Sequence, residues 1–491
     1  MSEKANKTYK DTFKNTVAFG GFQVFSILIS VIRGKLIAVL LGPVGIGINN
    51  LFMSSLTMLT TFTGFGLDLS AVRAISESNE NSSKIVKITK RLFLYTGILG
   101  LLLTLFLSYF LSKWTFATTS YTMSFALLSI YMLFTAINRG QQTIMRGLRK
   151  VKVLIYSGLI SSLVGLFISI PLYYFLGKDG IVPAIILTSI AVVIVTSFYT
   201  KTFTNSNVEV SIEEIRSSGR EMIKLGMMMV VASLLGLITK YLINIWIGRI
   251  GDIADVGLYA AAIGISSQYI GFILNSLSAD FFPRLVKVHG DSNEISKVVN
   301  EQTEIIVLLA TPLLIILLIT APLLISLLLS KEFLPIVDFI RFIAIGSFFQ
   351  MISFCMGYIS FAKNDKKTYL ILEGVLSNVF QLIITVGCYY FYGLKGLGYA
   401  FCTIYVLYSF IIYFFVRNKY GYKRNKETSE LIAFSLLFLL AAFFAVLYIE
   451  SALYKYLLTS IIFSLCFTYN YSVLNKRFDI ITLIKHKFRK R

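Results

Sequence analysis

Charged residues are scarce in this chain. Only 14% of its 491 residues are charged, whereas 56% are hydrophobic. One water-soluble core of this length could not bury so much apolar surface. Apolar runs of roughly 20 residues, each long enough to cross a bilayer, recur from residue 17 to residue 473. The composition excludes a soluble globular protein and predicts an all-α polytopic membrane protein.

Histidine and cysteine are also rare, with 2 and 4 copies. His289 and His486 fall in a predicted loop and in the tail, so we expect no catalytic or metal centre and no cofactor. The cysteines stand singly in apolar segments without metal-type spacing, and we interpret them as packing residues. They are Cys355, Cys388, Cys402 and Cys466.

A cleavable leader and a nucleic-acid-binding surface both lack support. The first apolar run follows a lysine-bearing tail and continues to Leu41 without a small-residue cleavage site, which predicts a retained helix. The net charge of +21 is dispersed in short loops, whereas phosphate tracking needs a continuous basic surface. We therefore expect no nucleic-acid partner.

Hydrophobic run lengths predict fourteen membrane-spanning helices. Their expected ranges are residues 16–41, 44–72, 92–112, 119–138, 153–176, 180–200, 222–248, 254–281, 302–329, 333–362, 368–392, 396–416, 430–449 and 452–474.

The lysines and arginines predict the orientation. With the amino terminus inside, the inner segments hold 36 of the 46 lysines and arginines, and the outer loops hold six. Because cytoplasmic loops of membrane proteins carry the excess of positive charge, we expect both termini in the cytoplasm.

The chain repeats itself at an offset of about 212 to 216 residues. An even number of helices per repeat predicts two six-helix lobes related by a pseudo-twofold axis along the membrane normal. We expect lobes at residues 1–205 and 206–420, then two extra helices and a basic tail at 421–491. The matching blocks are Val44-Gly45 with Val256-Gly257, Ser83–Val86 with Ser296–Val299, Gly158 and Ser161 with Gly374 and Ser377, and Tyr173–Phe175, Gly177, Gly180 and Ala184 with Tyr389–Phe391, Gly393, Gly396 and Ala400.

The repeated tyrosines lie at outer helix ends. Sugar stacking is one interpretation, but aromatic belts are normal there, so we favour membrane anchoring. The repeated glycines are interpreted as tight-turn positions.

Several predicted helices carry a polar line at helical spacing, which gives each of them one wettable face. Close packing of small residues explains the Gly, Ser and Thr positions equally well. The lines include Gln23 in 16–41, Asn50 in 44–72, Lys240 in 222–248, Gln268 and Asn275 in 254–281, Gln350, Ser353 and Gly357 in 333–362, and Glu373, Ser377, Gln381 and Thr385 in 368–392.

Four cations fall within predicted spans: Arg33, Lys35, Lys240 and Arg341. An ionised side chain in a span costs at least ~2.5 kcal/mol on insertion scales, so it usually faces a wet cavity. We therefore predict a cavity with cations in its outer half, lined also by Gln23, Asn50, Gln268, Asn275 and Gln381. The alternatives are interfacial snorkelling and, for Arg341, an ion pair with Asp338 one turn away.

Three acids lie near the predicted inner helix ends: Asp68, Asp280 and Glu373. We predict gate residues there, with ion coupling as the alternative. Helix-end ion pairs of Asp68 with Arg73 and of Asp280 with Arg284 would suffice for a gate.

Short motifs carry a family resemblance. The first helix contains Arg33-Gly34-Lys35 and leads into residues 41–47, LGPVGIG, and the helix at 254–281 ends in residues 281–285, FFPRL. With these motifs the chain resembles the polysaccharide-exporter branch of the multidrug/oligosaccharidyl-lipid/polysaccharide superfamily, specifically its O-antigen and lipid III flippases.

The resemblance implies two six-helix lobes plus two helices, a central cationic cavity and an undecaprenyl-diphosphate-linked oligosaccharide as cargo. It further implies a bacterial inner membrane and polymerase and chain-length proteins as partners. A drug or cation antiporter of the superfamily should place carboxylates, not cations, at mid-depth. A membrane-bound sugar polymerase needs a sizeable outer loop for its chemistry, and the predicted outer loops are short. We therefore predict a transporter, not an enzyme.

Overall fold

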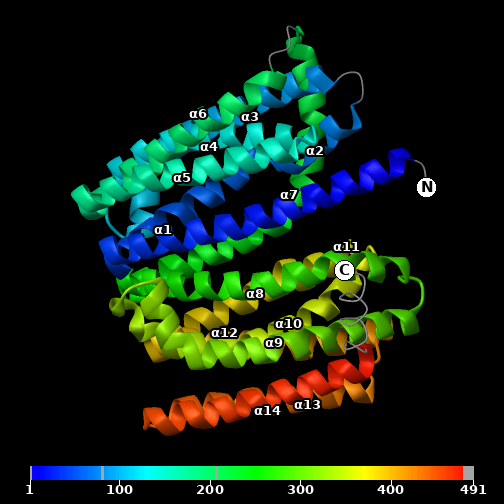
Figure 1. The fold of residues 1–491 in the computed structure, drawn as a ribbon. Coiled ribbons are helices and arrows are strands. Elements are labelled where there is room, and N and C mark those ends of the chain that lie inside the picture. The colour runs from blue at the N-terminus through cyan, green and yellow to red at the C-terminus, as the bar shows by residue number, and fades with distance from the viewer. Residues whose placement is uncertain (1–2, 79–81, 205–207, 479–491) are drawn as a thin grey trace. The chain divides into compact units, whose positions relative to one another are not determined.

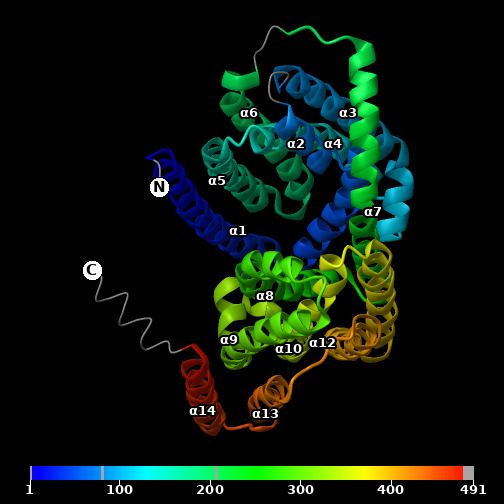
Figure 2. The same ribbon diagram turned by 90° about the vertical axis from the view of Figure 1, so that its right-hand side faces the viewer.

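The computed structural model describes residues 3–78, 82–204 and 208–478, and these residues form helices joined by short connections (Figures 1 and 2). The chain divides into two compact units. Unit 1 comprises Met1–Gly257 with Leu328–Ser330, and unit 2 comprises Leu258–Leu327 with Lys331–Arg491. The lobe boundary expected at residues 205 and 206 stays a prediction.

Unit 1 is a helical bundle in which α3 packs on α4, α4 on α6 and α6 on α5. Its elements are α1 (Glu3–Gly64), α2 (Leu67–Glu77), α3 (Ser82–Phe116), α4 (Thr122–Gly147), α5 (Val151–Leu176), the short 3-10 helix η1 (Gly177–Gly180), α6 (Ile181–Thr204) and α7 (Ile212–Ile250).

Unit 2 is built around α10 and α12, and α13 and α14 run side by side (Figures 1 and 2). Its elements are α8 (Ile253–Lys287), most of which belongs to this unit, α9 (Ser292–Leu328), the 3-10 helix η2 (Lys331–Ile336), α10 (Val337–Ala362), α11 (Lys366–Tyr369), the π-helix η3 (Leu370–Leu376), α12 (Ser377–Tyr420), α13 (Lys426–Tyr448) and α14 (Ala452–Phe478).

Eight helical segments of the described residues are long and apolar enough to cross a membrane. Three of them are 36, 51 and 55 residues long, beyond the roughly 20 residues that one crossing needs. The segments of 51 and 55 residues each contain two predicted spans, and the 36-residue segment, Ile29–Gly64, covers parts of the spans predicted at 16–41 and 44–72. The predicted spans in α4, α7 and α8 are helical as well. The prediction of an all-α polytopic membrane protein is confirmed.

The first two predicted helices form one element, α1, with a kink at Gly42. There φ is 64° and ψ is −171°, a combination that glycine adopts most readily, and Pro43 follows at once. Gly47 meets another segment of unit 1 closely, because a Cβ atom at this position would lie 1.9 Å from the carbonyl oxygen of Ile253.

The predicted continuous helix at 44–72 is wrong in its carboxy-terminal part, because α1 ends at Gly64 and α2 begins at Leu67. Phe65 and Gly66 both have positive φ, 48° and 68°. A Cβ atom at Gly66 would lie 2.3 Å from the carbonyl oxygen of Gly226 in α7. The break therefore serves a close backbone contact that no larger residue permits.

The sequence repeat recurs in backbone hydrogen bonds. The turn after α4 is closed by bonds from the N–H groups of residues 148, 149 and 150 to the carbonyls of residues 144, 146 and 145. The turn after α10 has the same bonds at an offset of 215, from residues 363, 364 and 365 to residues 359, 361 and 360. Arg149 and Asn364 share a positive φ, 54° and 55°. The two halves therefore build this turn identically.

The outer repeat blocks also match in conformation. Gly177 has φ 55° and ψ −128°, and Gly393 has φ 56° and ψ −141°. This supports the tight-turn interpretation of these two glycines. At Gly180 and Gly396 the reason for glycine is space, since a Cβ atom would lie 2.3 Å from the carbonyl oxygen of Leu172 and 2.0 Å from that of Cys388, respectively.

The repeated tyrosines divide into two environments. Tyr174 and Tyr390 are 69% and 65% exposed within the protein, as membrane anchors would be. Tyr173 and Tyr389 are each only 3% exposed, so for them the anchoring interpretation is wrong and they belong to the packed interior.

A polar ladder on α9 holds the segment that leads into α13. Ser296 accepts a hydrogen bond from the backbone N–H of Lys423 at 3.1 Å. Asn300 donates to the Lys423 carbonyl at 2.9 Å and accepts from the hydroxyl of Tyr422 at 2.8 Å. Glu304, one turn further along, is 3% exposed and accepts from the hydroxyl of Thr428.

The ladder continues to α14. The side-chain amide of Asn470, which is 2% exposed, donates to the carbonyl of Leu308 at 2.8 Å. Residues 296, 300, 304 and 308 lie four apart and therefore share one face of α9. This face fastens both terminal helices to unit 2.

Candidate functional site

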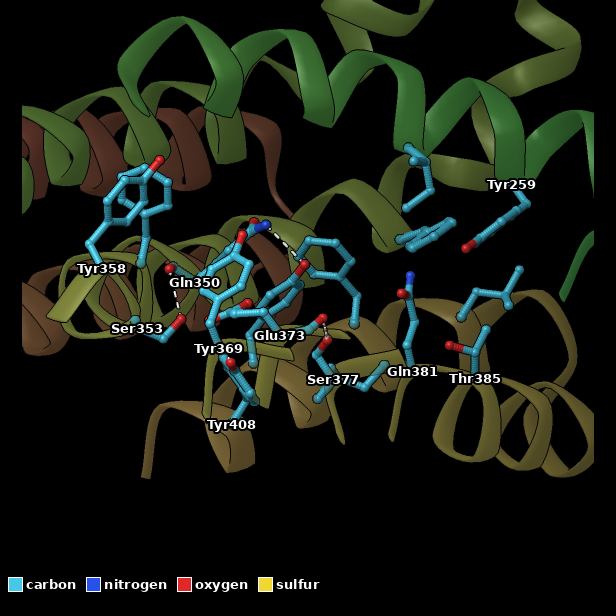
Figure 3. Close-up of a pocket in the computed structure, with 18 residues that line it drawn as sticks. Tyr259, Gln350, Ser353, Tyr358, Tyr369, Glu373, Ser377, Gln381, Thr385 and Tyr408 are labelled. Atoms are coloured by element: carbon cyan, nitrogen blue, oxygen red, sulfur yellow. Dashed lines mark hydrogen bonds between the residues drawn. The ribbon is translucent and has the colours of Figure 1, made fainter. Parts of the chain in front are cut away.

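Unit 2 contains a cavity of about 300 Å³ that is lined by polar and aromatic side chains (Figure 3). It lies among α8, α10, α11, η3 and the two parts of α12 before and after its kink at Gly393. The lining residues are Tyr259, Ile263, Phe339, Gln350, Ser353, Phe354, Gly357, Tyr358, Tyr369, Glu373, Ser377, Gln381, Thr385, Leu397, Phe401, Ile404, Tyr405 and Tyr408. None of these described lining residues is Lys, Arg or His.

The carboxylate of this cavity is carried by the π-helix η3. A π-helical turn disturbs the regular backbone ladder and often occurs at functional sites. Here polar side chains satisfy the affected carbonyls, because Ser377 donates to the carbonyl of Glu373 at 2.6 Å and Asn378 donates to that of Gly374 at 2.7 Å. Glu373, Ser377, Gln381 and Thr385 follow one another along the cavity (Figure 3).

Two neighbours fix the Glu373 carboxylate. The hydroxyl of Tyr408 donates a hydrogen bond to Oε1 at 2.7 Å. On α10, Gly357 leaves the space that the carboxylate occupies, since a Cβ atom there would lie 2.7 Å from the same oxygen. The side chain is half-buried and lines the cavity, so its remaining acceptor capacity is available to a ligand.

An amide and a phenol form a second polar group. Gln350 donates from Nε2 to the hydroxyl of Tyr405 at 2.9 Å. The Oε1 atom of Gln350 is buried and has no hydrogen-bond partner among the described residues. A buried acceptor without a partner is costly in a protein interior.

Aromatic rings form the walls. The rings of Phe354 and Tyr358 lie 4.6 Å apart, and those of Phe401 and Tyr405 lie 4.8 Å apart. At the far end the ring of Tyr259 stacks on Phe339, with 6.1 Å between centroids and 10° between planes. These contacts hold the rings in place, which gives the cavity a largely pre-formed shape.

The cavity unites two polar lines that the sequence predicts on separate helices. Gln350, Ser353 and Gly357 come from α10, and Glu373 and Gln381 come from η3 and α12. Of the predicted substrate-binding residues Gln381 lies here, and of the predicted gate residues Glu373. Their roles stay predictions.

The sequence reasoning missed five tyrosines of the cavity, and a signal for part of them was present. Leu397, Phe401, Tyr405 and Tyr408 recur at helical spacing on one face of α12. Tyr358 similarly follows the polar line of α10. The tyrosines are Tyr259, Tyr358, Tyr369, Tyr405 and Tyr408.

The four span cations do not share this cavity. In unit 1, the guanidinium of Arg33 lies beside the hydroxyl of the buried Tyr173, and its buried Nε has no hydrogen-bond partner among the described residues. Lys35 is half-buried and Lys240 is exposed. In unit 2, Arg341 pairs with Asp338 at 2.9 Å, which was the alternative considered for it. It lies nine residues before Gln350, roughly two and a half turns, and so on the opposite face of α10.

The predicted ion pair of Asp68 with Arg73 is wrong. Asp68 pairs with Arg139 of α4, whose Nε donates to Oδ1 at 3.2 Å and whose Nη1 donates to the Thr60 carbonyl at 3.0 Å. Arg73 pairs with Glu77 at 2.7 Å, one turn along α2. The Asp68 pair therefore ties α1, α2 and α4 together at the break after Gly64.

The remaining predicted residues are dispersed. Asn50 is half-buried, with its Nδ2 buried and without a partner among the described residues, and Gln268 is exposed. Arg284 forms an ion pair with Glu301 at 2.7 Å. The side chains of Gln23, Asn275 and Asp280 lie outside the part of the chain that the structure describes, and so does the predicted pair of Asp280 with Arg284.

Within the described ranges no group of three His, Cys, Asp or Glu side chains could hold a metal ion. The four cysteines are free: Cys355 and Cys466 are buried, and Cys388 and Cys402 are half-buried. This agrees with their interpretation as packing residues.

Long apolar helices around a cavity with polar and aromatic lining are typical of a polytopic membrane protein with a transporter-type fold. Comparison with known proteins narrows this class. The family model described as "Polysaccharide biosynthesis protein" matches residues 36–338, more than half of the chain. The chain belongs to this polysaccharide biosynthesis protein family.

Two curated relatives carry the same name. The lipid III flippase of Escherichia coli (strain K12) is 20% identical over 392 residues, which cover 76% of this chain and 91% of the relative. The lipid III flippase of Shigella flexneri matches with the same identity and coverage.

Solved structures share the fold. A lipid II flippase MurJ in an inward closed conformation superposes with a TM-score of 0.69 at 16% identity, covering 95% of this chain and all of that one. An inward-facing multidrug resistance MATE family transporter of the MOP superfamily gives 0.67 at 15% identity, covering 83% of this chain and 95% of that one. The predicted transporter fold is confirmed.

Proposed function

We propose that the protein is a flippase for a lipid-linked oligosaccharide. It moves an undecaprenyl-diphosphate-linked glycan, an O-antigen or related repeat unit, from the inner to the outer leaflet of the bacterial inner membrane. Family membership and the flippase names of its relatives support this function.

The observation that carries the proposal is the polar cavity of unit 2. Between membrane-crossing helices, unpaired polar groups are unfavourable and are retained for function. This cavity nevertheless holds a carboxylate, two primary amides and five phenols. Such groups suit the hydroxyl-rich head group of a lipid-linked glycan, which must leave water during flipping.

The diphosphate of the cargo needs cations. Arg33 carries a buried donor without a partner among the described residues, and this donor is suited to a phosphate oxygen. Lys35, Lys240 and Arg341 complete the proposed cationic set, with Gln23, Asn50, Gln268 and Asn275 as polar neighbours. Asp68, Asp280 and Glu373 are the proposed gate residues.

The proposed topology has both termini in the cytoplasm and two six-helix lobes. Polymerase and chain-length proteins of the same glycan pathway are the proposed partners. A cysteine replacing Lys178 or Lys395 should react with an impermeant thiol reagent added to intact cells, whereas one replacing Arg149 should not. Labelling at Arg149 would overturn this orientation.

The membrane potential favours the proposed direction. A head group with about two negative charges gains ~2.3 kcal/mol per charge per 100 mV as it moves outward. At ~100 mV the gain is ~4.6 kcal/mol, a bias of more than a thousandfold. An obligatory ion gradient is therefore not required by the energetics.

Mass spectrometry of lipid-linked glycans in a deletion strain tests the function. We expect one undecaprenyl-diphosphate glycan to accumulate in this strain. Reintroducing the native gene should return that glycan to its normal level. The triple substitution of Arg33, Lys240 and Arg341 by Ala should reduce export while the protein remains folded and inserted. Full export by this variant would exclude the proposed cationic set, and no accumulation in the deletion strain would exclude the flippase.

A second candidate function, a cation or drug antiporter of the superfamily, is favoured by one observation: the carboxylate of Glu373 faces a cavity that lacks cationic side chains among its described residues. Flipping in proteoliposomes with a potassium-valinomycin potential and no ion gradient separates the two. Transport by the native protein and by Glu373→Gln, Asp68→Asn and Asp280→Asn supports gate roles. Failure without an ion gradient, together with loss of transport in any one variant, identifies a coupling carboxylate.

A further inference from the structure

We propose that the cavity of unit 2 is a sugar subsite that binds one uncharged pyranose ring and rejects sugars that carry a carboxylate. This inference rests on the proposed function, because it concerns the glycan part of the cargo. It narrows the cargo to glycans that present a neutral or N-acetylated sugar to unit 2.

The polar groups of the cavity match sugar hydroxyls in kind. A sugar hydroxyl both donates and accepts, and the phenols, amides and aliphatic hydroxyls of the lining do the same. One acceptor faces the cavity: the carboxylate of Glu373, which has acceptor capacity beyond its hydrogen bond from Tyr408. A hydroxylated ring would therefore satisfy acceptor capacity that the protein leaves open.

The absence of cationic side chains among the described lining residues disfavours binding of acidic sugars. No described lining residue is cationic, so a uronic acid carboxylate would be buried without a counter-ion, beside Glu373. Burying an unpaired charge is among the largest costs in recognition. The diphosphate is excluded from this cavity for the same reason, so the sugar and the diphosphate must occupy different places.

Size and walls favour a single ring. Ligand pockets range over roughly 300–1,000 Å³, and this cavity of about 300 Å³ lies at the small end. Its aromatic walls, with Phe354 against Tyr358 and Phe401 against Tyr405, offer flat apolar faces to the C–H side of a pyranose. A whole repeat unit would not fit.

An organic cation is the competing occupant, because a carboxylate among aromatic rings also suits a cation. A cation offers no acceptor to the donors of the cavity, however, and would leave the amide and phenol protons of Gln350, Gln381 and Tyr405 without new partners. The mixed donor and acceptor lining therefore favours a sugar.

Saturation-transfer NMR on the full chain in lipid nanodiscs tests the subsite without transport. The probes are methyl N-acetyl-β-glucosaminide, methyl β-glucuronide and tetraphenylphosphonium. We expect saturation transfer to the neutral glycoside and at least tenfold weaker binding of the glucuronide. Equal binding of both sugars, binding of neither, or displacement of the neutral glycoside by tetraphenylphosphonium at lower concentration would overturn the proposal.

Variants sharpen the test. Glu373→Gln should weaken binding of the neutral glycoside about tenfold, the effect of one strong hydrogen bond. Gln381→Arg should raise glucuronide binding at least tenfold, because it supplies the missing counter-ion; a purely structural role of Gln381 predicts no such gain. Tyr422→Phe, which removes a tyrosine hydroxyl that bonds Asn300 outside the cavity, is the matched control and should bind as the native protein does.

The comparison of neutral glycoside and glucuronide uses the native protein, so it does not depend on the folding of any variant. Sugar selectivity without flipping of any lipid-linked glycan would refute the proposed function and leave the subsite standing. Flipping with no sugar preference would refute the subsite alone.

Discussion

The two halves of the chain differ in the side chains along one face of a repeated helix. At an offset of 216 residues, the first-half mates of Glu373, Ser377, Gln381 and Thr385 are the small residues Ser157, Ser161, Gly165 and Ser169. The latter are buried in α5. Small residues let helices approach closely. A Cβ atom at Gly165 would lie 3.0 Å from the methyl group of Thr188 in α6.

The larger side chains of the second half lie beside the cavity of unit 2. In unit 2 the corresponding side chains border the cavity of about 300 Å³, and the backbone that carries Glu373 is a π-helix where α5 is regular. The backbone turns that frame both lines are the same, with matching hydrogen bonds and matching glycine conformations. The same backbone turns thus frame a packed helix face in the first half and a cavity in the second, and the side chains of that face differ between the two.

The largest loss of stability is expected at the repeated glycines Gly180 and Gly396, where neither half has space for a Cβ atom. Gly396→Ala brings a Cβ atom to 2.0 Å from the carbonyl of Cys388, and Gly180→Ala brings one to 2.3 Å from that of Leu172. Each should destabilise the protein by more than ~3 kcal/mol, because backbone must move. Thermal unfolding of purified protein in detergent measures the effect. Gly387→Ala, with nothing within 4 Å, is the control; a normal Tm for either tight variant would contradict the shared scaffold.

Exchanging the line residues tests the difference directly. Gly165→Gln adds a long side chain to a packed face and should cost ~3 kcal/mol. The reverse change, Gln381→Gly, removes a cavity side chain and should cost only ~1 kcal/mol, the helix penalty of glycine. Chemical denaturation of both variants gives the two values. Equal costs would mean that the two halves are packed alike.

Replacing the positive-φ glycine of the outer turn should destabilise the protein equally in both halves. Gly177→Ala and Gly393→Ala each force an alanine into a region that glycine alone adopts readily, with no atom within 4 Å to clash. We expect a loss of ~1–3 kcal/mol for each, equal within error. Parallel melting curves measure the pair, and a clear inequality would show that the two turns are not equivalent.

The smallest effect concerns acid stability. A hydrogen bond from Lys419, followed by one from the backbone N–H of Thr368, holds the pKa of Asp365 well below its usual range. The first-half mate is Lys150, so this stabilisation belongs to unit 2 alone. A depressed folded-state pKa stabilises the protein above the unfolded pKa of ~3.9, and the gain is lost as the pH falls below that value.

We therefore expect Asp365→Asn to lower Tm by at most ~2 °C at pH 7, in keeping with a partly exposed pair. The difference from the native protein should shrink below pH 4. Glu430→Gln, which removes the exposed pair with Lys426, is the control and should change little at either pH. A difference for Asp365→Asn that grows on acidification would contradict the assigned ion pair.

The sequence allowed prediction of what depends on run length and local spacing. The helices followed from apolar runs, and the polar lines at 350–357 and 373–385 followed from a period of about four residues. The π-helix was not predictable in this way, because it depends on the side chains of Ser377 and Asn378 reaching particular carbonyls.

Long-range partners were missed for a related reason. Arg139 lies 71 residues from Asp68, whereas Arg73 is near in sequence and seemed the natural partner. The break at Phe65 and Gly66 was hidden in an apolar run, although the closely spaced Gly64 and Gly66 were a signal. The tyrosines of the cavity were missed because they come from four separate elements, α8, α10, α11 and α12, which only the fold brings together.

The polar ladder of α9 sets a condition on biogenesis. During synthesis, α9 enters the membrane before α13 and α14 exist, and Glu304, inside the predicted span 302–329, then lacks the hydrogen bond that Thr428 of α13 supplies. Lipid cannot solvate such groups, so α9 needs protection until the terminal helices arrive. A chain truncated after α12 would retain both bundles and still present this face to the bilayer. Cellular quality control, not loss of a transport step, would then remove it.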